Sequence, residues 1–196
     1  YPLRRQRQMC IRDSYKVSLK AQVHELKEYV SNYSKENSIG MYIYGNTGCG
    51  KSHLAIGILK GLIKKNYSGV FYNVVELLDA IRETYDPNNP ANPKSRLEQE
   101  FKRQVFVLDD FGAQKTSSWV SDRLYALINR RYQNKKTLII TSNIPMHQLL
   151  MRVDDRLASR IIDMCKEFQI TADDYRQRNR DKVSYKPKKN QFGHRT

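Results

Sequence analysis

Apolar residues recur along the chain in two patterns, short continuous runs and spacings of three and four residues. Continuous runs bounded by polar turns predict buried strands, and they lie at 41–44, 70–74, 105–110, 137–143 and 167–170. The other spacing predicts amphipathic helices, which we place at 18–33, 53–65, 76–84, 95–102, 118–132 and 154–164, with a short helix starting at Pro145. Strands that alternate with helices predict an α/β domain whose five-stranded parallel sheet is flanked by helices.

One main domain is expected to account for most of the 196 residues, spanning residues 38–175. Residues 1–14 do not begin with methionine, lack periodicity and resemble the translation of a sequencing adapter, so we expect a non-native leader. Residues 15–37 are expected to be a truncated N-terminal helix and linker, and residues 176–196 a basic C-terminal tail. The proline-rich loop at 86–93 is expected to be a mobile segment inside the main domain.

Basic residues are concentrated at the two ends of the chain. The formal net charge is +15; residues 1–20 carry six Lys or Arg and one acid, and residues 176–196 carry eight and one. Such ends favour contact with nucleic acid, although solvated tails have the same composition. Because no apolar run approaches the roughly 20 residues that cross a bilayer, we expect no membrane partner. Three scattered cysteines indicate a reducing, cytoplasmic setting.

A glycine-rich segment between the first predicted strand and the next helix carries the clearest chemical signal. It matches G-x-x-x-x-G-K-[ST], the phosphate-binding P-loop pattern, in the strand–loop–helix context that the pattern requires. Its glycines let backbone N–H groups converge, and the helix start adds its positive dipole end. Lys51 is predicted to contact the β- and γ-phosphates, and the Ser52 hydroxyl to bind Mg²⁺. The predicted nucleotide-binding residues are Gly45, Asn46, Thr47, Gly48, Cys49, Gly50, Lys51 and Ser52; the alternative is a chance glycine-rich turn.

Two adjacent acids end the apolar run at 105–110, where a P-loop protein needs a second metal contact. Asp109 is predicted to hold Mg²⁺, and Asp110 to polarise the attacking water. Asp110 also begins the letters D-F-G of protein kinases, but a kinase catalytic loop does not precede them, and kinases lack this kind of P-loop. Asn143, at the end of the next strand, could orient that water or sense the γ-phosphate; an isolated Asn there is more often a turn former.

Four segments in order resemble an AAA+ ATPase. They are the P-loop at 45–52, the acidic strand at 105–110, Asn143 in the sensor-1 position, and residues 155–161, which are similar to the arginine-finger segment of bacterial initiators and helicase loaders. The resemblance covers about residues 38–180 and points to the DnaC/DnaI helicase-loader group, with IstB-like ATP-binding proteins sharing the same motifs.

The resemblance adds arginines to the predicted site. Arg160 is expected to reach the ATP of a neighbouring subunit, with Arg156 as its substitute, and Arg176 to contact the γ-phosphate in its own subunit. Helical spacing alone favours a different explanation, in which Arg156 and Arg160 pair with nearby aspartates on a surface helix. The predicted catalytic residues are Lys51, Asp110, Asn143, Arg160 and Arg176.

The implied activity is slow, Mg²⁺-dependent ATP hydrolysis that loads a replicative ring helicase onto single-stranded DNA. The protein is expected to form a homo-oligomer when ATP is bound and to have a small or absent helical lid. Two alternatives remain open: an IstB-like transposition accessory ATPase, and a nucleotide-regulated DNA-binding adaptor with negligible turnover.

Overall fold

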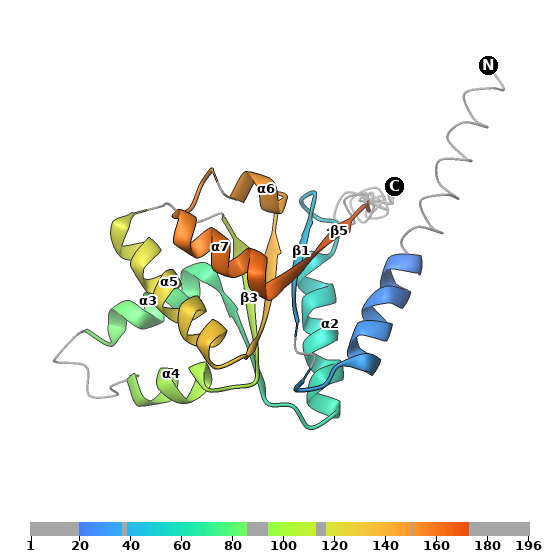
Figure 1. Ribbon diagram of the computed structural model, residues 1–196, viewed down its shortest axis with the longest axis horizontal. Coiled ribbons are helices and arrows are strands. Elements are labelled where there is room, and N and C mark those ends of the chain that lie inside the picture. The colour runs from blue at the N-terminus through green and yellow to red at the C-terminus, as the bar shows by residue number, and fades with distance from the viewer. Residues whose placement is uncertain (1–19, 37–38, 86–93, 113–116, 150, 173–196) are drawn as a thin grey trace, which may run out of the picture.

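Five parallel strands form one sheet in the order β2-β3-β4-β1-β5 (Figure 1). The computed structural model describes residues 20–36, 39–85, 94–112, 117–149 and 151–172. The strands are β1 (Gly40–Gly45), β2 (Gly69–Asn73), β3 (Val105–Phe111), β4 (Thr137–Ser142) and β5 (Cys165–Ile170). The predicted five-stranded parallel sheet is therefore confirmed, and the carboxyl ends of all five strands lie at the same edge of the sheet.

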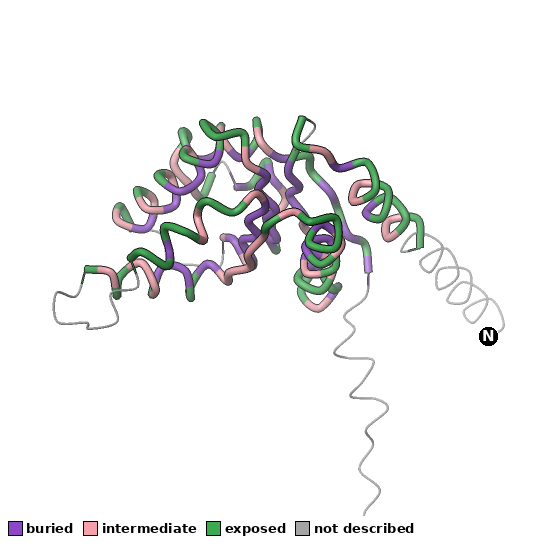
Figure 2. Tube along the Cα trace, turned by 90° about the horizontal axis from the view of Figure 1, so that it is seen from below, coloured by how far each residue is buried: buried purple, intermediate pink, exposed green. Residues whose placement is uncertain are grey.

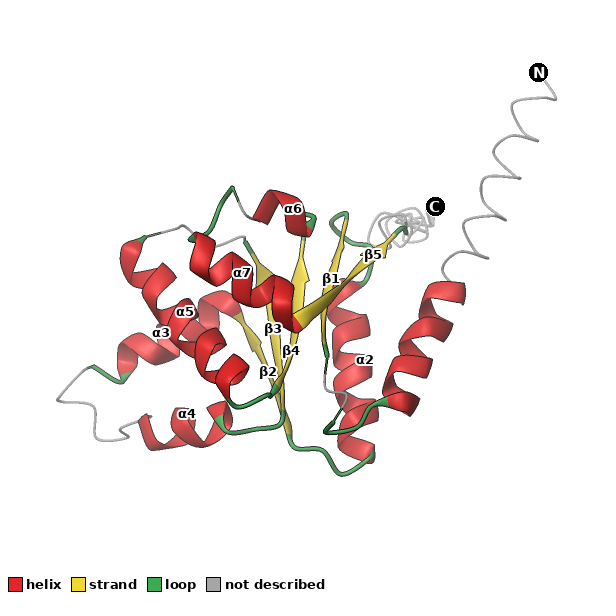
Figure 3. Ribbon diagram, viewed as in Figure 1, coloured by secondary structure: helices red, strands yellow, loops and turns green. Residues whose placement is uncertain are grey.

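Helices connect the strands and cover the sheet (Figure 3). The first covers residues 20–32. It is followed by α2 (Lys51–Lys64), α3 (Val74–Glu83), α4 (Lys94–Phe101), α5 (Ser118–Gln133), α6 (Met146–Leu149) and α7 (Asp155–Met164). Their bounds differ from the predicted ones by a few residues. For example, Val74 begins α3 instead of ending a strand, because the Asn73 side chain accepts a hydrogen bond from the Val75 N–H at 2.9 Å and caps the helix.

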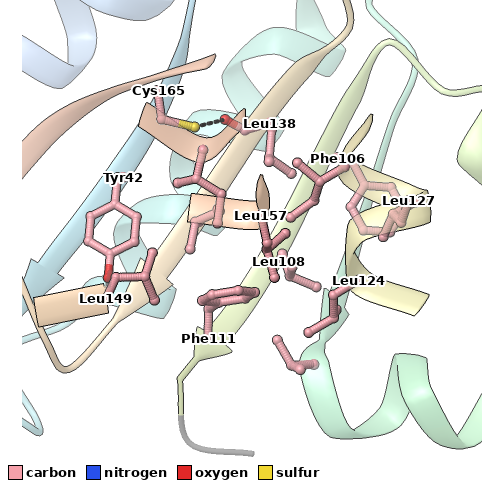
Figure 4. Packing of buried hydrophobic residues seen from close by; sticks show 14 of the residues in the cluster. Tyr42, Phe106, Leu108, Phe111, Leu124, Leu127, Leu138, Leu149, Leu157 and Cys165 are labelled. Carbon is pink, nitrogen blue, oxygen red and sulfur yellow. Dashed lines mark hydrogen bonds between the residues drawn. The ribbon is translucent and has the colours of Figure 1, made fainter. Parts of the chain in front are cut away.

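Each face of the sheet has its own hydrophobic core. On one face, side chains of β1, β3 and β4 pack against α3, α5, α6 and α7, as the close-up around Phe106, Leu108 and Leu124 shows (Figure 4). On the other face, the alternate side chains of the same strands pack against α2 and the helix at residues 20–32. Buried positions accordingly line the inner sides of both helical layers (Figure 2).

The helix at residues 20–32 is an integral part of this second core. Its Leu26 is buried, and Val30 lies so close to α2 that a Cβ on Gly61 would be 2.8 Å from the Val30 Cγ1. The Lys65 ammonium donates hydrogen bonds to carbonyl groups at the helix C-terminus, including that of Ser31 at 2.7 Å. The negative end of the helix dipole also stabilises a cation at this position. The N-terminal helix therefore has a fixed position beside the P-loop helix.

Arg131 is a charged side chain inside the first core, with 1% of its surface exposed. Its guanidinium donates to four backbone carbonyl groups at distances of 2.6 to 3.3 Å, in the turns that lead into β3 and β4, and it stacks on Phe106. Burial lowers the pKa of Arg131 to about 10, so the group stays charged at neutral pH. These four bonds fix the two turns, while the buried Arg131 Nε has no hydrogen-bond partner among the described residues.

Several predicted segments lie outside the described residues. These are the leader at 1–14, the loop at 86–93, the tail at 176–196, and any lid that follows residue 172. In the part of the chain that is described, no helix has the length and apolar character needed to cross a membrane.

Candidate nucleotide-binding site

The P-loop connects the end of β1 to the start of α2. Gly48 and Gly50 have φ values of 78° and 97°, which residues with side chains rarely adopt. Gly45 must be glycine for another reason, since a Cβ there would lie 2.4 Å from the Ile170 carbonyl oxygen on β5. The α2 N-terminus has no side-chain cap, and the first N–H groups of a helix have no acceptor within the helix. The loop therefore presents backbone donors and a positive dipole end to an anion.

A cavity of about 850 Å³ opens above this loop, at the carboxyl edge of the sheet. Its lining includes P-loop residues 47–52, together with Asp109 and Asp110 from β3 and Asn143 from the end of β4. Val23 of the N-terminal helix also lines it. Ligands of open parallel sheets bind at this edge, and the volume lies within the usual range for small-molecule sites.

Lys51 is held at the centre of the cavity although only 7% of its surface is exposed. Its ammonium group donates to the carbonyl oxygens of Gly45 at 3.0 Å and Asn46 at 2.9 Å. It also donates to the Asn143 Oδ1 at 2.7 Å. All three acceptors are neutral oxygens, so the positive charge of Lys51 is not neutralised by any of these contacts and remains available to an anion in the cavity.

The two acids lie at an irregularity of β3. The register with β4 shifts between Leu108 and Phe111, because β3 has one extra residue there and both Asp109 and Asp110 lie opposite Thr141. Asp109 is buried, with 9% of its surface exposed, whereas Asp110 adopts a φ of 61°. Aspartate tolerates this left-handed conformation better than most residues, and it turns the second acid to a different direction from the first.

Asn143 connects the two sides of the cavity. While its Oδ1 accepts from Lys51, its Nδ2 donates to the Asp110 Oδ1 at 3.2 Å. The structure thus brings together three of the predicted catalytic residues, and it orients the Asn143 amide by contacts on both ends. Asn143 lies just after β4, which ends at Ser142 and not at Asn143 as the apolar run predicts.

These residues fit a nucleotide with a divalent cation. The Lys51 ammonium and the uncapped start of α2 supply donors for phosphate oxygens. A Cβ on Gly50 would meet no atom within 4 Å, so open space borders the loop at this position. Ser52 and Asp109 both line the cavity, and a hydroxyl and a carboxylate are the oxygen ligands that Mg²⁺ prefers. Within the described residues there is no cluster of three or more His, Cys, Asp or Glu that could hold a metal by itself.

The two α7 arginines lie outside the cavity and have different partners. Arg156 binds Asp154, the α7 N-cap, at 3.0 Å, and its hydrogen bonds lower the pKa of the Asp154 carboxyl. Both guanidinium groups lie over tyrosine rings of α5, that of Arg156 5.0 Å from the centre of Tyr125 and that of Arg160 4.2 Å from the centre of Tyr132. The expected aspartate partner is therefore found for Arg156, whereas Arg160 has only its ring contact among the described residues. Arg176 lies outside the described residues.

Sequence reasoning missed the contribution of Thr141. Its hydroxyl donates to the Asp109 Oδ1 at 2.5 Å and accepts from the Asp110 N–H at 2.9 Å. The only sequence signal was a hydroxyl residue near the end of a strand that neighbours the acidic strand. Val23 was also missed, because a helix that precedes β1 gives no sign that it reaches the P-loop.

Strand order, a P-loop between β1 and α2, and acids at the end of β3 define a P-loop nucleotide-binding protein with the AAA+ arrangement. Comparison with known proteins agrees with this class. The chain belongs to the IstB-like ATP binding protein family, whose sequence model matches residues 6–183. The predicted AAA+ fold and the resemblance to DnaC and IstB-like ATPases are thus confirmed.

Individual relatives differ in name but share the same domain. The chain is 28% identical to the uncharacterised protein YqaM of Bacillus subtilis, over 81% of this chain and 49% of YqaM. It is 23% identical to the replicative helicase loader DnaC of Escherichia coli K12, over 79% of this chain and 63% of DnaC. The chain therefore spans about half to two thirds of the length of these relatives.

Solved structures extend the comparison. The crystal structure of a DnaC helicase loader matches with a TM-score of 0.67 and 28% identity, covering 75% of this chain and 86% of that one. The replication initiator DnaA bound to AMPPCP and single-stranded DNA has a TM-score of 0.62 at 23% identity, over 76% of this chain and 44% of that one. At that identity the DnaA likeness shows a shared fold.

Proposed function

We propose that this protein is a Mg²⁺-dependent ATPase that loads a replicative ring helicase onto single-stranded DNA. The observation that supports it best is the Lys51–Asn143–Asp110 network in a P-loop cavity, in a chain that is 28% identical to a DnaC helicase loader over most of that protein's structure. In such a loader, the nucleotide state decides whether helicase and DNA are held or released.

In the proposed reaction, the residues of the cavity have separate tasks. Lys51 and the start of α2 bind the phosphates, and Ser52 and Asp109 hold Mg²⁺, which neutralises developing charge on the phosphate oxygens. Asp110 accepts a proton from the attacking water, and Asn143 orients that water. Asp110 is one methylene shorter than a glutamate base at this position would be, so we expect slow turnover.

Arg160 is the arginine that we assign to the neighbouring subunit's ATP in a nucleotide-bound homo-oligomer. Arg156 is engaged by Asp154 through its Nε and Nη2, and moving it would break these bonds. In the described part of the chain, Arg160 has no carboxylate partner within 4 Å, and stacking on Tyr132 leaves the edge of its guanidinium free to donate. Arg176 is proposed to contact the γ-phosphate within its own subunit.

A transposition accessory ATPase is the second candidate, because the matching family is the IstB-like ATP binding proteins. Such a protein would prefer duplex DNA and a transposase, whereas a helicase loader would prefer single strands and a ring helicase. An adaptor with negligible turnover is the third possibility. It would bind ATP and DNA but show no change in turnover when Asp110 is replaced.

The deciding experiment measures ATP turnover of the purified chain with single-stranded DNA, duplex DNA and no DNA, together with capture of a replicative helicase in ATP or ADP. The proposal expects turnover stimulated by single strands and helicase capture that depends on ATP. Arg160→Ala should lower turnover at least tenfold, while the matched Arg156→Ala stays within about twofold. Stimulation by duplex DNA alone, or equal effects of the two variants, would contradict the loader proposal or the Arg160 assignment, respectively.

A further inference from the structure

The β-bulge at the end of β3 interrupts the parallel ladder with β4 at the two acids, while Asp109 stays paired with Asn73 of β2. Thr141 lies opposite both acids and is itself almost fully buried, with 1% of its surface exposed. Its side chain takes the place of the missing ladder bond, since the Asp110 N–H donates to the Thr141 Oγ1 at 2.9 Å. A bulge next to an active site commonly redirects a side chain in this way.

One hydroxyl serves both acids because it has one hydrogen and two acceptor lone pairs. The hydrogen is directed to the Asp109 Oδ1 at 2.5 Å, and a lone pair accepts from the Asp110 amide. The first contact fixes the orientation of the Asp109 carboxylate. The second stabilises Asp110 at a φ of 61°, a conformation that is unfavourable for a residue with a side chain.

We propose that Thr141 is a positioning residue that sets Asp109 for metal binding and Asp110 for water activation at the same time; this inference rests on the proposed function. Removing the hydroxyl frees the Asp109 carboxylate to rotate and leaves the Asp110 amide without its acceptor. Partners of metal ligands typically change metal affinity or activity by about 10- to 100-fold when they are removed. Because the positioning depends on the hydroxyl alone, a serine at this position should keep the metal affinity and the activity.

The test compares three variants. Thr141→Val keeps the shape of the side chain without the hydroxyl, and Thr141→Ser keeps the hydroxyl. Ser142→Ala is the matched control, because Ser142 is equally buried in the same strand but its hydroxyl donates to the Phe111 carbonyl at 2.7 Å and touches neither acid. Thr141→Ala, which also lacks the hydroxyl and cannot overpack the site, provides a second deletion if the valine variant does not fold.

For each variant, the affinity for a fluorescent ATP analogue is titrated with Mg²⁺ and with EDTA, and ATP turnover is measured across a range of Mg²⁺ concentrations. In EDTA, Thr141→Val should bind the ATP analogue within about twofold of the wild type. With Mg²⁺ it should lose about tenfold of the affinity that Mg²⁺ adds in the wild type, and its kcat should fall tenfold or more. Thr141→Ser should stay close to the wild type in both, and Ser142→Ala should keep the wild-type Mg²⁺ response.

Each other outcome has a definite meaning. Wild-type Mg²⁺ response and turnover in Thr141→Val, or an equal loss in Ser142→Ala, would overturn the positioning role. A wild-type chain that does not turn over ATP, but whose Mg²⁺-dependent affinity requires the Thr141 hydroxyl, would support the role and overturn hydrolysis in the proposed function. A wild-type chain whose affinity does not respond to Mg²⁺ would overturn both.

Discussion

Replacing Lys51 by methionine tests the centre of the nucleotide site. Methionine is similar in length and unbranched, so it can occupy the same buried space beside the P-loop. The change removes the charge and the three hydrogen bonds to Gly45, Asn46 and Asn143. Because Asn143 borders the cavity, Asn46 is exposed and Gly45 is only partly buried, water can reach the released acceptors, and we expect a loss of unfolding free energy below about 1.5 kcal/mol.

The expected effect on nucleotide affinity is larger than the effect on stability. A hydrogen bond to a charged partner contributes about 1.5–3 kcal/mol, against about 1 kcal/mol for neutral partners. Lys51 already donates to three neutral oxygens, so each phosphate contact gains only the difference, about 0.5–2 kcal/mol. Two such contacts give about 2.5 kcal/mol at the middle of this range, and Lys51→Met should weaken ATP binding about 70-fold.

Titration of a fluorescent ATP analogue in the presence of Mg²⁺ measures this loss, and urea denaturation shows whether the variant is folded. Lys60→Met is the matched control, since Lys60 is on the same helix but exposed outside the cavity; it should bind within about twofold of the wild type. A Lys51→Met chain that is folded and binds within threefold of the wild type would refute the assignment of Lys51 as the phosphate ligand.

Three further predictions concern the fold that positions the site. Arg131→Met should lower the unfolding free energy by about 3 kcal/mol in urea, because one buried and three partly buried carbonyl groups lose their donor; a loss below 1 kcal/mol would contradict this. Gly61→Val should expose residues 20–32 to limited proteolysis because its side chain overlaps Val30, whereas Gly57→Val, whose Cβ meets no atom within 4 Å, should not. Burial raises the pKa of Tyr42 to about 12, so the folded state disfavours its ionised form. Its contribution to the free energy of unfolding is complete below the Tyr pKa of the unfolded chain, about 10, and is lost as pH rises through 12. In thermal melts between pH 8 and 12, Tyr42→Phe should therefore lose less stability than the wild type.

The elements of this fold can be read from the sequence because each depends on local patterns. The continuous apolar runs within 105–110 and 137–143 predict strands that are covered on both faces, as central strands of a parallel sheet are. The P-loop is also local, since its glycines, lysine and serine are consecutive and the loop has essentially one conformation. The roles predicted for Asp109, Asp110 and Asn143 need only the fact that neighbouring parallel strands end at the same edge.

Features that depend on register or on side-chain competition could not be predicted. Thr141 acts because β3 has one more residue than β4 at this point, and no periodicity records a bulge. Arg131 continues the apolar face of α5, three residues after Ile128, yet a charged residue there reads as exposed until its four carbonyl partners are known. Similarly, both α7 arginines lie over tyrosine rings of α5, and only the ion pair of Arg156 with Asp154 distinguishes two arginines that look equivalent in the sequence.

The contacts across the cavity link nucleotide binding to the geometry of the acids. Lys51 belongs to α2, Asn143 follows β4, and Asp110 is the residue before the last in β3, so one line of hydrogen bonds joins three elements. A phosphate that draws the Lys51 ammonium away from Asn143 leaves the amide held by Asp110 alone, and the amide can then rotate toward a water. The Asp110 backbone stays in place, because its N–H donates to the Thr141 hydroxyl. Under the proposed function, phosphate binding would therefore release the Asn143 amide from Lys51 for water orientation, while the backbone of the proposed base Asp110 stays bound to Thr141.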